Sequence, residues 1–270
     1  MSSDSIIDTS KPSAGRIYDY ILGGHHNFEV DRQAAEHIIQ VVPFLPKNLR
    51  LQRWCLQDLA VELTEKRGFD IVVDFASGLP TNDHIHHVVP RGTTVIYSDY
   101  DPVVVEYGRE ILSDTANTYY FQADARRPEE LLNRPEVQEI LDGRRDVALI
   151  HWGISLFLRD EELAHAARSL YEWSSASACW TFMAQGVDPG TGAPVMQQVS
   201  EIYERMGSRM YYRSLNTILQ LILPWQPDEN GMISIMDWHG IDRHEMTEDD
   251  LRVFGAAGGS YGAYLIKSSA

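Results

Sequence analysis

The stretch Asp74-Phe75-Ala76-Ser77-Gly78-Leu79-Pro80-Thr81 directly follows an apolar run at residues 69–73 of this 270-residue chain. The pattern predicts a buried strand that carries an acid into a turn of small residues, as in the nucleoside sites of parallel α/β sheets. A second apolar run, at residues 93–97, ends in Ser98-Asp99-Tyr100-Asp101-Pro102. Two acids at the ends of neighbouring strands therefore predict a site that holds a nucleoside.

The composition of the first turn favours a cationic ligand over a dinucleotide. A pyrophosphate site uses three glycines so that backbone N–H groups can approach the phosphates. This turn has Ala76 and Pro80 at the first and third of those positions and keeps only Gly78. Asp74 would repel a pyrophosphate, but it would attract an ammonium or a sulfonium by ~1 to 4 kcal/mol per close pair. We therefore predict S-adenosylmethionine, which carries both cations, as the cofactor.

A third short strand ends in Asp124 and Ala125, so three consecutive strand ends are expected to line one crevice. The oxygens of Asp124 could accept the adenine amino group there. In this interpretation Asp99 holds the ribose, and Asp74 holds the methionine part together with the turn from Ala76 to Gly78. These residues, with Ala125, form the predicted cofactor site in the sheet.

The rest of the chain predicts helices followed by strands and helices in alternation. The first helices are predicted at residues 13–22, 30–42 and 46–67. Strands are predicted at residues 69–73, 93–97, 118–122, 146–150 and 177–184, with helices at 83–89, 102–112, 129–141, 160–173, 196–206 and 214–221. Two more strands, at 232–238 and 260–266, flank a predicted helix at 247–254. The alternation indicates a mostly parallel α/β sheet that an antiparallel pair closes.

The composition argues against a nucleic-acid partner. The chain has 39 acidic and 23 basic residues, a net charge of −16 and no basic run that could contact phosphates. Cys55 and Cys179 lie in apolar or helical segments, so we expect a reducing compartment. The N-terminus does not follow a signal-peptide pattern, and no apolar run reaches the roughly 18 residues of a membrane span. We predict a cytoplasmic protein with no membrane partner.

The segment from Arg16 to Arg32, RIYDYILGGHHNFEVDR, resembles the N-terminal signature YDYxLGGxxNF of a bacterial family of S-adenosylmethionine-dependent methyltransferases, formerly a domain of unknown function. The resemblance continues at residues 74–81, 97–104, 123–124 and 128–130, and more weakly at 223–228. It implies a class I, Rossmann-like α/β methyltransferase with a mostly parallel seven-stranded sheet and an N-terminal helical cap. The implied organisation is a disordered tail at 1–12, a cap at 13–67, and a cofactor-binding core at 68–270 with acceptor-site insertions near 185–245.

The resemblance also implies site residues. Asp74, Gly78, Asp99 and Asp124 occupy the family's motif positions. Four residues match its N-terminal signature, and aromatic rings there could enclose a sulfonium by cation–π attraction of ~0.5 to 2 kcal/mol; they are Tyr18, Tyr20, Asn27 and Phe28. We expect Tyr18, Asn27 and Phe28 to contact the cofactor. The candidates for a catalytic role are Tyr18, Tyr20, His25 and His151.

Some positions depart from the family pattern or suggest other chemistry. Ala76 replaces a usual glycine, and Leu156 lies where relatives often carry a histidine. His151 follows a predicted strand and is expected at the same rim as the acids, while His25 lies in the cap signature. The cluster Asp83-His84-Ile85-His86-His87 does not have the fixed spacing of a metal site, so we predict no metal. No Gly-x-Ser-x-Gly elbow indicates a hydrolase.

Three functions remain open at this stage. The leading one is methyl transfer from S-adenosylmethionine to a small molecule, of which secondary metabolites are one class. In the second, the cofactor's own methionine chain is the substrate, and cyclisation or elimination releases methylthioadenosine. In the third, a non-catalytic protein binds the cofactor as a sensor. The sequence leaves the oligomeric state open, with a homodimer as one option.

Overall fold

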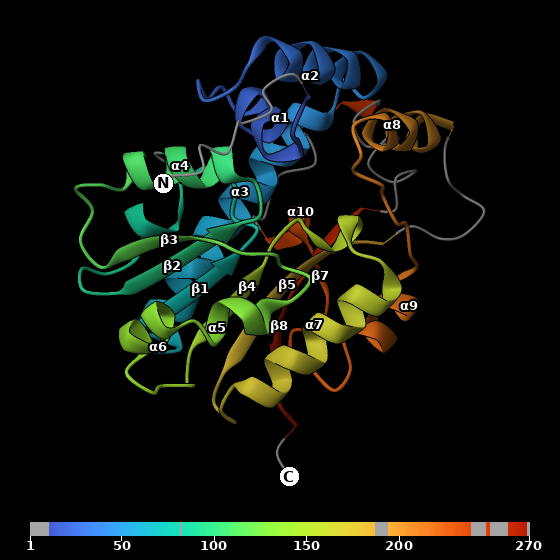
Figure 1. Cartoon of the computed structure of the whole chain (residues 1–270). Coiled ribbons are helices and arrows are strands. Elements are labelled where there is room, and N and C mark those ends of the chain that lie inside the picture. Colours follow the sequence, from blue (N-terminus) through green and yellow to red (C-terminus); the bar gives the residue numbers. More distant parts are fainter. Residues whose placement is uncertain (1–10, 82, 187–193, 239–246, 249–258, 269–270) are drawn as a thin grey trace.

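The computed structural model describes residues 11–81, 83–186, 194–238, 247–248 and 259–268 (Figure 1). Its centre is one mixed sheet in the order β3-β2-β1-β4-β5-β8-β6, with β7 also paired to β8. The five parallel strands are β1 (Ile71–Phe75), β2 (Thr94–Asp99), β3 (Thr118–Gln122), β4 (Ala148–His151) and β5 (Cys179–Gln185). This confirms the predicted α/β fold.

The antiparallel part of the sheet lies along β8 (Ser260–Ile266), which pairs with β5. Two short strands, β6 (Gln226–Pro227) and β7 (Ile233–Ser234), pair with β8 at different points along it. The sheet therefore has eight strands rather than the seven that we predicted. The extra strand arises because the segment that joins β5 to β8 contributes two separate contacts to the same strand.

The central strands are apolar because helices cover both faces of the sheet, and every residue of β1 is buried. One face packs against α3 (Leu45–Val61) and α4 (Pro102–Ile111). The other face packs against α5 (Pro128–Leu132), α6 (Pro135–Leu141), α7 (Asp160–Trp173) and α9 (Leu215–Leu221). This three-layer arrangement leaves the carboxyl ends of the parallel strands as the edge on which a site can form.

The cap predicted at residues 13–67 contains α1 (Ala14–Ile21), α2 (Glu29–Val41) and α3. The helices α1 and α2 lie with α8 (Pro194–Arg205) on one side of the sheet in Figure 1. The helices α1, α2 and α8 share a small hydrophobic core, built from Ile17, Ile21, Ala35, Ile38, Val42, Val199, Ile202 and Tyr203. The helix α8 comes from the region in which we predicted acceptor-site insertions. A segment late in the chain therefore packs against the N-terminal helices.

Several predicted elements differ in the structure. The helix predicted at 129–141 is split into α5 and α6, because Pro135 cannot continue a helix but suits the start of one. The helix predicted at 83–89 is a single 3₁₀ turn, Ile85–His87. The strand predicted at 232–238 is β7 followed by the short helix α10 (Ile235–Trp238). The helix predicted at 247–254 falls mainly outside the described residues.

The long N-terminal helix also ends differently. Its α-helical part, α3, stops at Val61 and continues as a π-helical turn, Glu62–Lys66. Among the described helices, none combines the length and the apolar composition that a bilayer crossing requires.

Candidate cofactor and acceptor site

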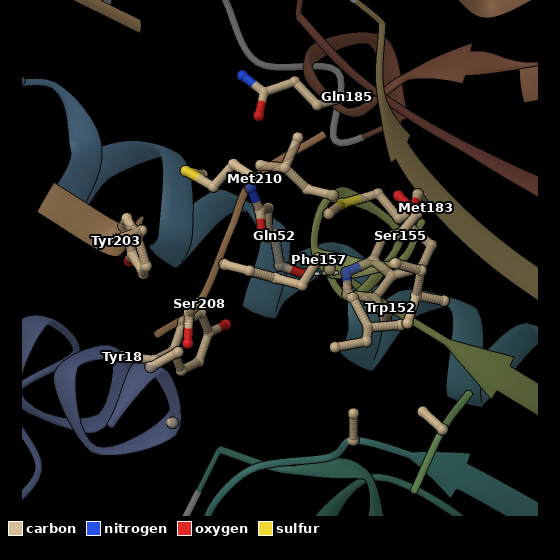
Figure 2. Close-up of a pocket in the computed structure, with 18 of the residues that line it drawn as sticks. Tyr18, Gln52, Trp152, Ser155, Phe157, Met183, Gln185, Tyr203, Ser208 and Met210 are labelled. Carbon is tan, nitrogen blue, oxygen red and sulfur yellow. Dashed lines mark hydrogen bonds between the residues drawn. The ribbon is translucent and has the colours of Figure 1, made fainter. Parts of the chain in front are cut away.

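A cavity of about 500 Å³ lies between the carboxyl ends of the parallel strands and the cap helices (Figure 2). Strand ends and the turns that follow them supply one wall, which includes Asp74, Ala76, Ser77, Asp99, Asp124 and Ala125. The helices α1 and α3 supply the facing wall, which includes Tyr18, Gln52 and Arg53. The volume falls in the usual range for ligand sites.

The turn after β1 has two residues in a backbone conformation that favours glycine. Ala76 has φ of 52° and Gly78 has φ of 64°, both in the left-handed region. Glycine adopts this region freely, whereas alanine is strained there by about 1 to 2 kcal/mol. Ala76 lines the cavity, whereas Gly78 is not among the lining residues and donates its backbone N–H to Asp99.

The carboxylate of Asp99 is held by two backbone groups at the end of β2. Asp101 N donates to its Oδ1 at 3.0 Å, and Gly78 N donates to its Oδ2 at 3.2 Å. Burial raises the pKa of Asp99 to about 6, although these hydrogen bonds favour the charged form. The side chain therefore lies fixed in the cavity wall and titrates close to neutral pH.

Asp124 also lines the cavity, but Arg126 binds its carboxylate. Arg126 Nε lies 2.8 Å from both carboxylate oxygens, and the backbone N–H of Arg126 donates to Oδ1 at 2.9 Å. Burial opposes ionisation, but the hydrogen bonds from Arg126 outweigh it and lower the pKa of Asp124. The Arg126 side chain is 49% exposed, whereas the Asp124 side chain is 18% exposed.

Asp74 and Arg53 are the two most deeply buried charged side chains in the cavity wall. Asp74 is 1% exposed and Arg53 is 3% exposed. Asp74 Oδ2 and the Nε and Nη1 atoms of Arg53 are buried without a hydrogen-bond partner. Buried polar atoms are normally paired, so these three atoms indicate a site that a polar ligand completes.

Sequence analysis did not find Arg53, although a signal was present. Leu49, Arg53, Leu56 and Ala60 are spaced along one face of α3, so a charged residue interrupts an apolar stripe. A cation on a buried helix face needs a partner, and that rule alone could have marked Arg53.

Other predicted site residues do not line the cavity. Tyr20 donates its hydroxyl to Glu36 at an exposed position, and His25 is exposed. Asn27 Nδ2 donates to Asp19 and to the Gly24 carbonyl, which holds the loop of the cap signature. The Phe28 ring lies 5.3 Å from the Arg16 guanidinium. Of the four residues that match the N-terminal signature, Tyr18 lines the cavity.

His151 lies inside the sheet rather than at its rim. Its Nε2 lies 3.3 Å from the Ala125 carbonyl, its Nδ1 accepts from Trp180 Nε1 at 3.1 Å, and its ring stacks on Phe75. Burial lowers the pKa of His151 to about 4. The lowered pKa favours the neutral imidazole, and both of its nitrogens are hydrogen-bonded. One of these bonds is to the backbone of Ala125, a residue that lines the cavity.

One part of the cavity is lined mainly by aromatic rings and thioethers, with Gln52, Gln185 and Ser208 among them. Figure 2 shows the rings of Trp152, Phe157 and Tyr203 and the thioethers of Met183 and Met210 around it. Two polar groups here bond to the protein itself: Ser155 Oγ donates to the Met183 carbonyl, and Trp152 Nε1 donates to the Gln52 carbonyl. We call this part the aromatic chamber; Leu156, one of the departures from the family pattern, also lines the cavity.

Two histidines of the cluster after the first turn, His84 and His86, hydrogen-bond to other groups of the protein. His84 Nδ1 accepts from Ile85 N, and His86 hydrogen-bonds to the Tyr97 hydroxyl. Within the described ranges, no group of three His, Cys, Asp or Glu side chains is arranged to hold a metal ion.

A parallel sheet with an antiparallel closing strand, and with acids at the ends of β1 and β2, defines a class I methyltransferase. The family model described as S-adenosyl methyltransferase matches residues 1–260, so the chain belongs to this family. The protein is an S-adenosylmethionine-dependent methyltransferase, and S-adenosylmethionine is its cofactor.

Solved structures show the same architecture. A proposed methyltransferase from Thermobifida fusca YX is 26% identical, with a TM-score of 0.84 over 97% of each chain. A DUF574 family protein from Streptomyces avermitilis MA-4680 is 25% identical, with a TM-score of 0.84 over 97% of this chain and 100% of the other. Magnesium protoporphyrin IX methyltransferase from Synechocystis PCC 6803, solved with SAH, is 12% identical with a TM-score of 0.56 over 97% and 98%, and shares the fold alone. No curated protein matches the chain.

Proposed function

We propose that the protein methylates a small, largely apolar acceptor, and that the acceptor binds in the aromatic chamber. The observation that carries this proposal is the continuity of the cavity. The strand-end acids and the aromatic chamber line the same space, so a cofactor and an acceptor can lie side by side in it. Secondary metabolites are the substrate class that we favour, in the cytoplasm that the sequence predicts.

The strand-end acids are the proposed cofactor contacts. Asp99 presents a carboxylate held by two backbone N–H groups, and it would accept hydrogen bonds from the two ribose hydroxyls. Asp124 and Ala125 would contact the adenine. Asp74 and the turn at Ala76 would lie at the methionine end. The unpartnered oxygen of Asp74 supports this fit, because a cationic ligand would satisfy it. Bound S-adenosylmethionine supplies an electrophilic methyl group on a sulfonium.

The aromatic chamber is the proposed acceptor site. Ring faces and thioethers bind flat apolar molecules through burial and dispersion, and methionines adapt to irregular shapes. The helices α1 and α8 contribute Tyr18, Val199 and Tyr203 to the cavity lining. Methyl transfer depends first on holding the acceptor in line with the methyl group, and a chamber built from several elements is suited to that task.

The test is an incubation of the purified protein with S-adenosylmethionine and a panel of neutral aromatic acceptors. Mass spectrometry would identify every adenosine-containing product against a control without protein. The proposal predicts S-adenosylhomocysteine together with a methylated acceptor. Enzyme-dependent methylthioadenosine would instead identify the cofactor's own chain as the substrate. Unchanged cofactor with every acceptor would contradict methylation of this substrate class.

A further inference from the structure

We propose that Asn48 and Gln52 bind a neutral polar edge of the methyl acceptor, on which a hydrogen-bond donor lies beside a carbonyl, as in an aromatic lactam. We call the two residues the amide pair. The inference rests on the proposed function, because it assigns a polar contact to the molecule that the aromatic chamber binds. It narrows the methyl acceptor from any apolar ring system to one that carries such an edge.

The amide pair lies on the face of α3 that lines the cavity. Asn48 and Gln52 are four residues apart, so their side chains are neighbours on the helix surface. Both line the cavity, together with Leu45, Leu49 and Leu56 of the same helix. Two amides therefore interrupt a stripe of leucines that borders the ligand space.

The side-chain carbonyl of Asn48 lacks a hydrogen-bond donor. Its Oδ1 is buried, and no group in the described part of the chain donates to it. Buried amide oxygens are normally hydrogen-bonded, because burial removes the bonds that water would supply. Since Asn48 lines the cavity, a donor on a bound ligand would complete this bond.

Gln52 places the second amide in the aromatic chamber. The residue is 8% exposed, and across the described ranges its side-chain amide has no hydrogen-bond partner. Gln52 Oε1 lies 3.8 Å, and Met183 Cε lies 3.7 Å, from the point at which a β-carbon on Gly153 would be. The amide therefore lies close to a thioether of the chamber and to the residues that follow β4.

Two other polar groups of the chamber are already used within the protein. Ser155 Oγ donates to the Met183 carbonyl, and Trp152 Nε1 donates to the Gln52 carbonyl of the backbone. The amide pair has no such partners and carries no charge at any ordinary pH. It therefore suits a neutral polar group of a ligand rather than an ion.

The shape of an amide indicates the chemistry that it recognises. Asn and Gln side chains present a carbonyl beside an NH₂ group, so they match an edge with an adjacent donor and acceptor. A flat aromatic lactam has this edge, with its N–H beside its carbonyl. Its rings would pack against the aromatic side chains and thioethers of the chamber.

Adenine has a similar edge, but the proposed adenine contact lies at the other side of the sheet. Asp124 follows β3, whereas Met183 belongs to β5. The strands β2, β1 and β4 lie between these two strands, so roughly 19 Å separates them at the usual strand spacing. The amide pair is therefore assigned to the methyl acceptor and not to the nucleoside.

The test uses 2-quinolone, an aromatic lactam, and naphthalene, which has the same two-ring outline without the polar edge. Equilibrium dialysis would measure both affinities for protein saturated with S-adenosylhomocysteine, in the wild type, Asn48→Leu and Gln52→Leu. We expect each substitution to weaken 2-quinolone by about fivefold or more, because the lactam edge then loses a buried partner. Naphthalene should bind no more weakly, since leucine keeps the wall apolar. Arg50→Leu is the control, because Arg50 is exposed on the same helix.

Four results would overturn the amide pair and leave the chamber in place. In the first, the wild type binds naphthalene but not 2-quinolone, and in the second both variants bind 2-quinolone like the wild type. In the third, both probes weaken equally, which would make the amides structural. The fourth is weaker binding of methylthioadenosine by the variants, which would place adenine there. Binding of neither probe by the wild type is a separate outcome, since it would contradict the proposed aromatic acceptor site itself.

Discussion

Asp99 is the residue with the clearest pH dependence, because burial raises its pKa to about 6. The ribose hydroxyls would donate hydrogen bonds to the ionised carboxylate. The affinity for the nucleoside should therefore be highest above pH 7 and fall as the pH drops through 6. One proton allows at most about a tenfold loss per pH unit. Isothermal titration of methylthioadenosine between pH 5 and 8 would measure this, because this ligand has the ribose but lacks the cofactor's amino-acid end. A flat profile would contradict the ionised ribose contact.

The strand-end acids could be predicted from the sequence, and the charge that interrupts an apolar helix stripe could have marked Arg53, whereas the aromatic chamber could not be predicted. Consecutive parallel strands end at one edge of the sheet, so apolar runs that end in Asp74, Asp99 and Asp124 were enough to bring those residues together. The chamber joins Trp152 with Met210, from segments whose packing no local pattern encodes. His151 was expected at the rim because it ends a strand, but its ring points into the core.

The cap helices are joined to the sheet by a buried ion network around Arg16. Arg16 Nε donates to Asp31 Oδ2 at 2.8 Å, and its Nη1 donates to Asp101 Oδ2 at 3.1 Å. Asp101 in turn begins α4 by accepting from Val103 N, and it donates to Asp99. The signature segment therefore fixes α1 and α2 against the turn that carries the ribose acid.

The network gives a prediction for stability. Arg16→Met leaves the fully buried Asp31 without its cation, so the free energy of unfolding should fall by about 3 to 5 kcal/mol. Arg32→Met is the control, because Arg32 is a half-exposed cap residue whose ion pair with Glu29 is worth less than about 1 kcal/mol. Urea unfolding followed by circular dichroism would give both values. Equal effects of the two substitutions would refute the structural role of the network.

At the scale of the whole molecule, the cavity joins the predicted cap to the sheet, because Arg53 of α3 and Asp74 of β1 both line it with buried, unpartnered polar atoms. A ligand that contacts both should hold the cap in place and slow its local opening. We expect S-adenosylhomocysteine to protect peptides from α1 to α3 against hydrogen exchange more than methylthioadenosine does, at equal saturation. Arg53→Met should remove the difference. Equal protection by both ligands would show that the cap does not respond to the amino-acid end.

The strands of the sheet could be predicted from the sequence more completely than the packing of the cap helices. Apolar runs and their spacing predicted the five parallel strands and β8, because burial on both faces imposes that pattern. The packing of α8 against α1 and α2 depends on contacts between distant segments, which no local periodicity encodes. The packing of α8 against α1 and α2 therefore required the three-dimensional structure.

The most direct test of the cofactor site is the titration of S-adenosylhomocysteine into the wild-type protein and Asp99→Ala, with Glu106→Ala as an exposed control on α4. We predict one binding site in the wild type, unchanged binding in Glu106→Ala, and at least about tenfold weaker binding in Asp99→Ala, because charge-assisted hydrogen bonds to the ribose are lost. Circular dichroism would confirm that the variants are folded. Binding by Asp99→Ala with wild-type affinity, or no binding by the wild type, would contradict the proposed site.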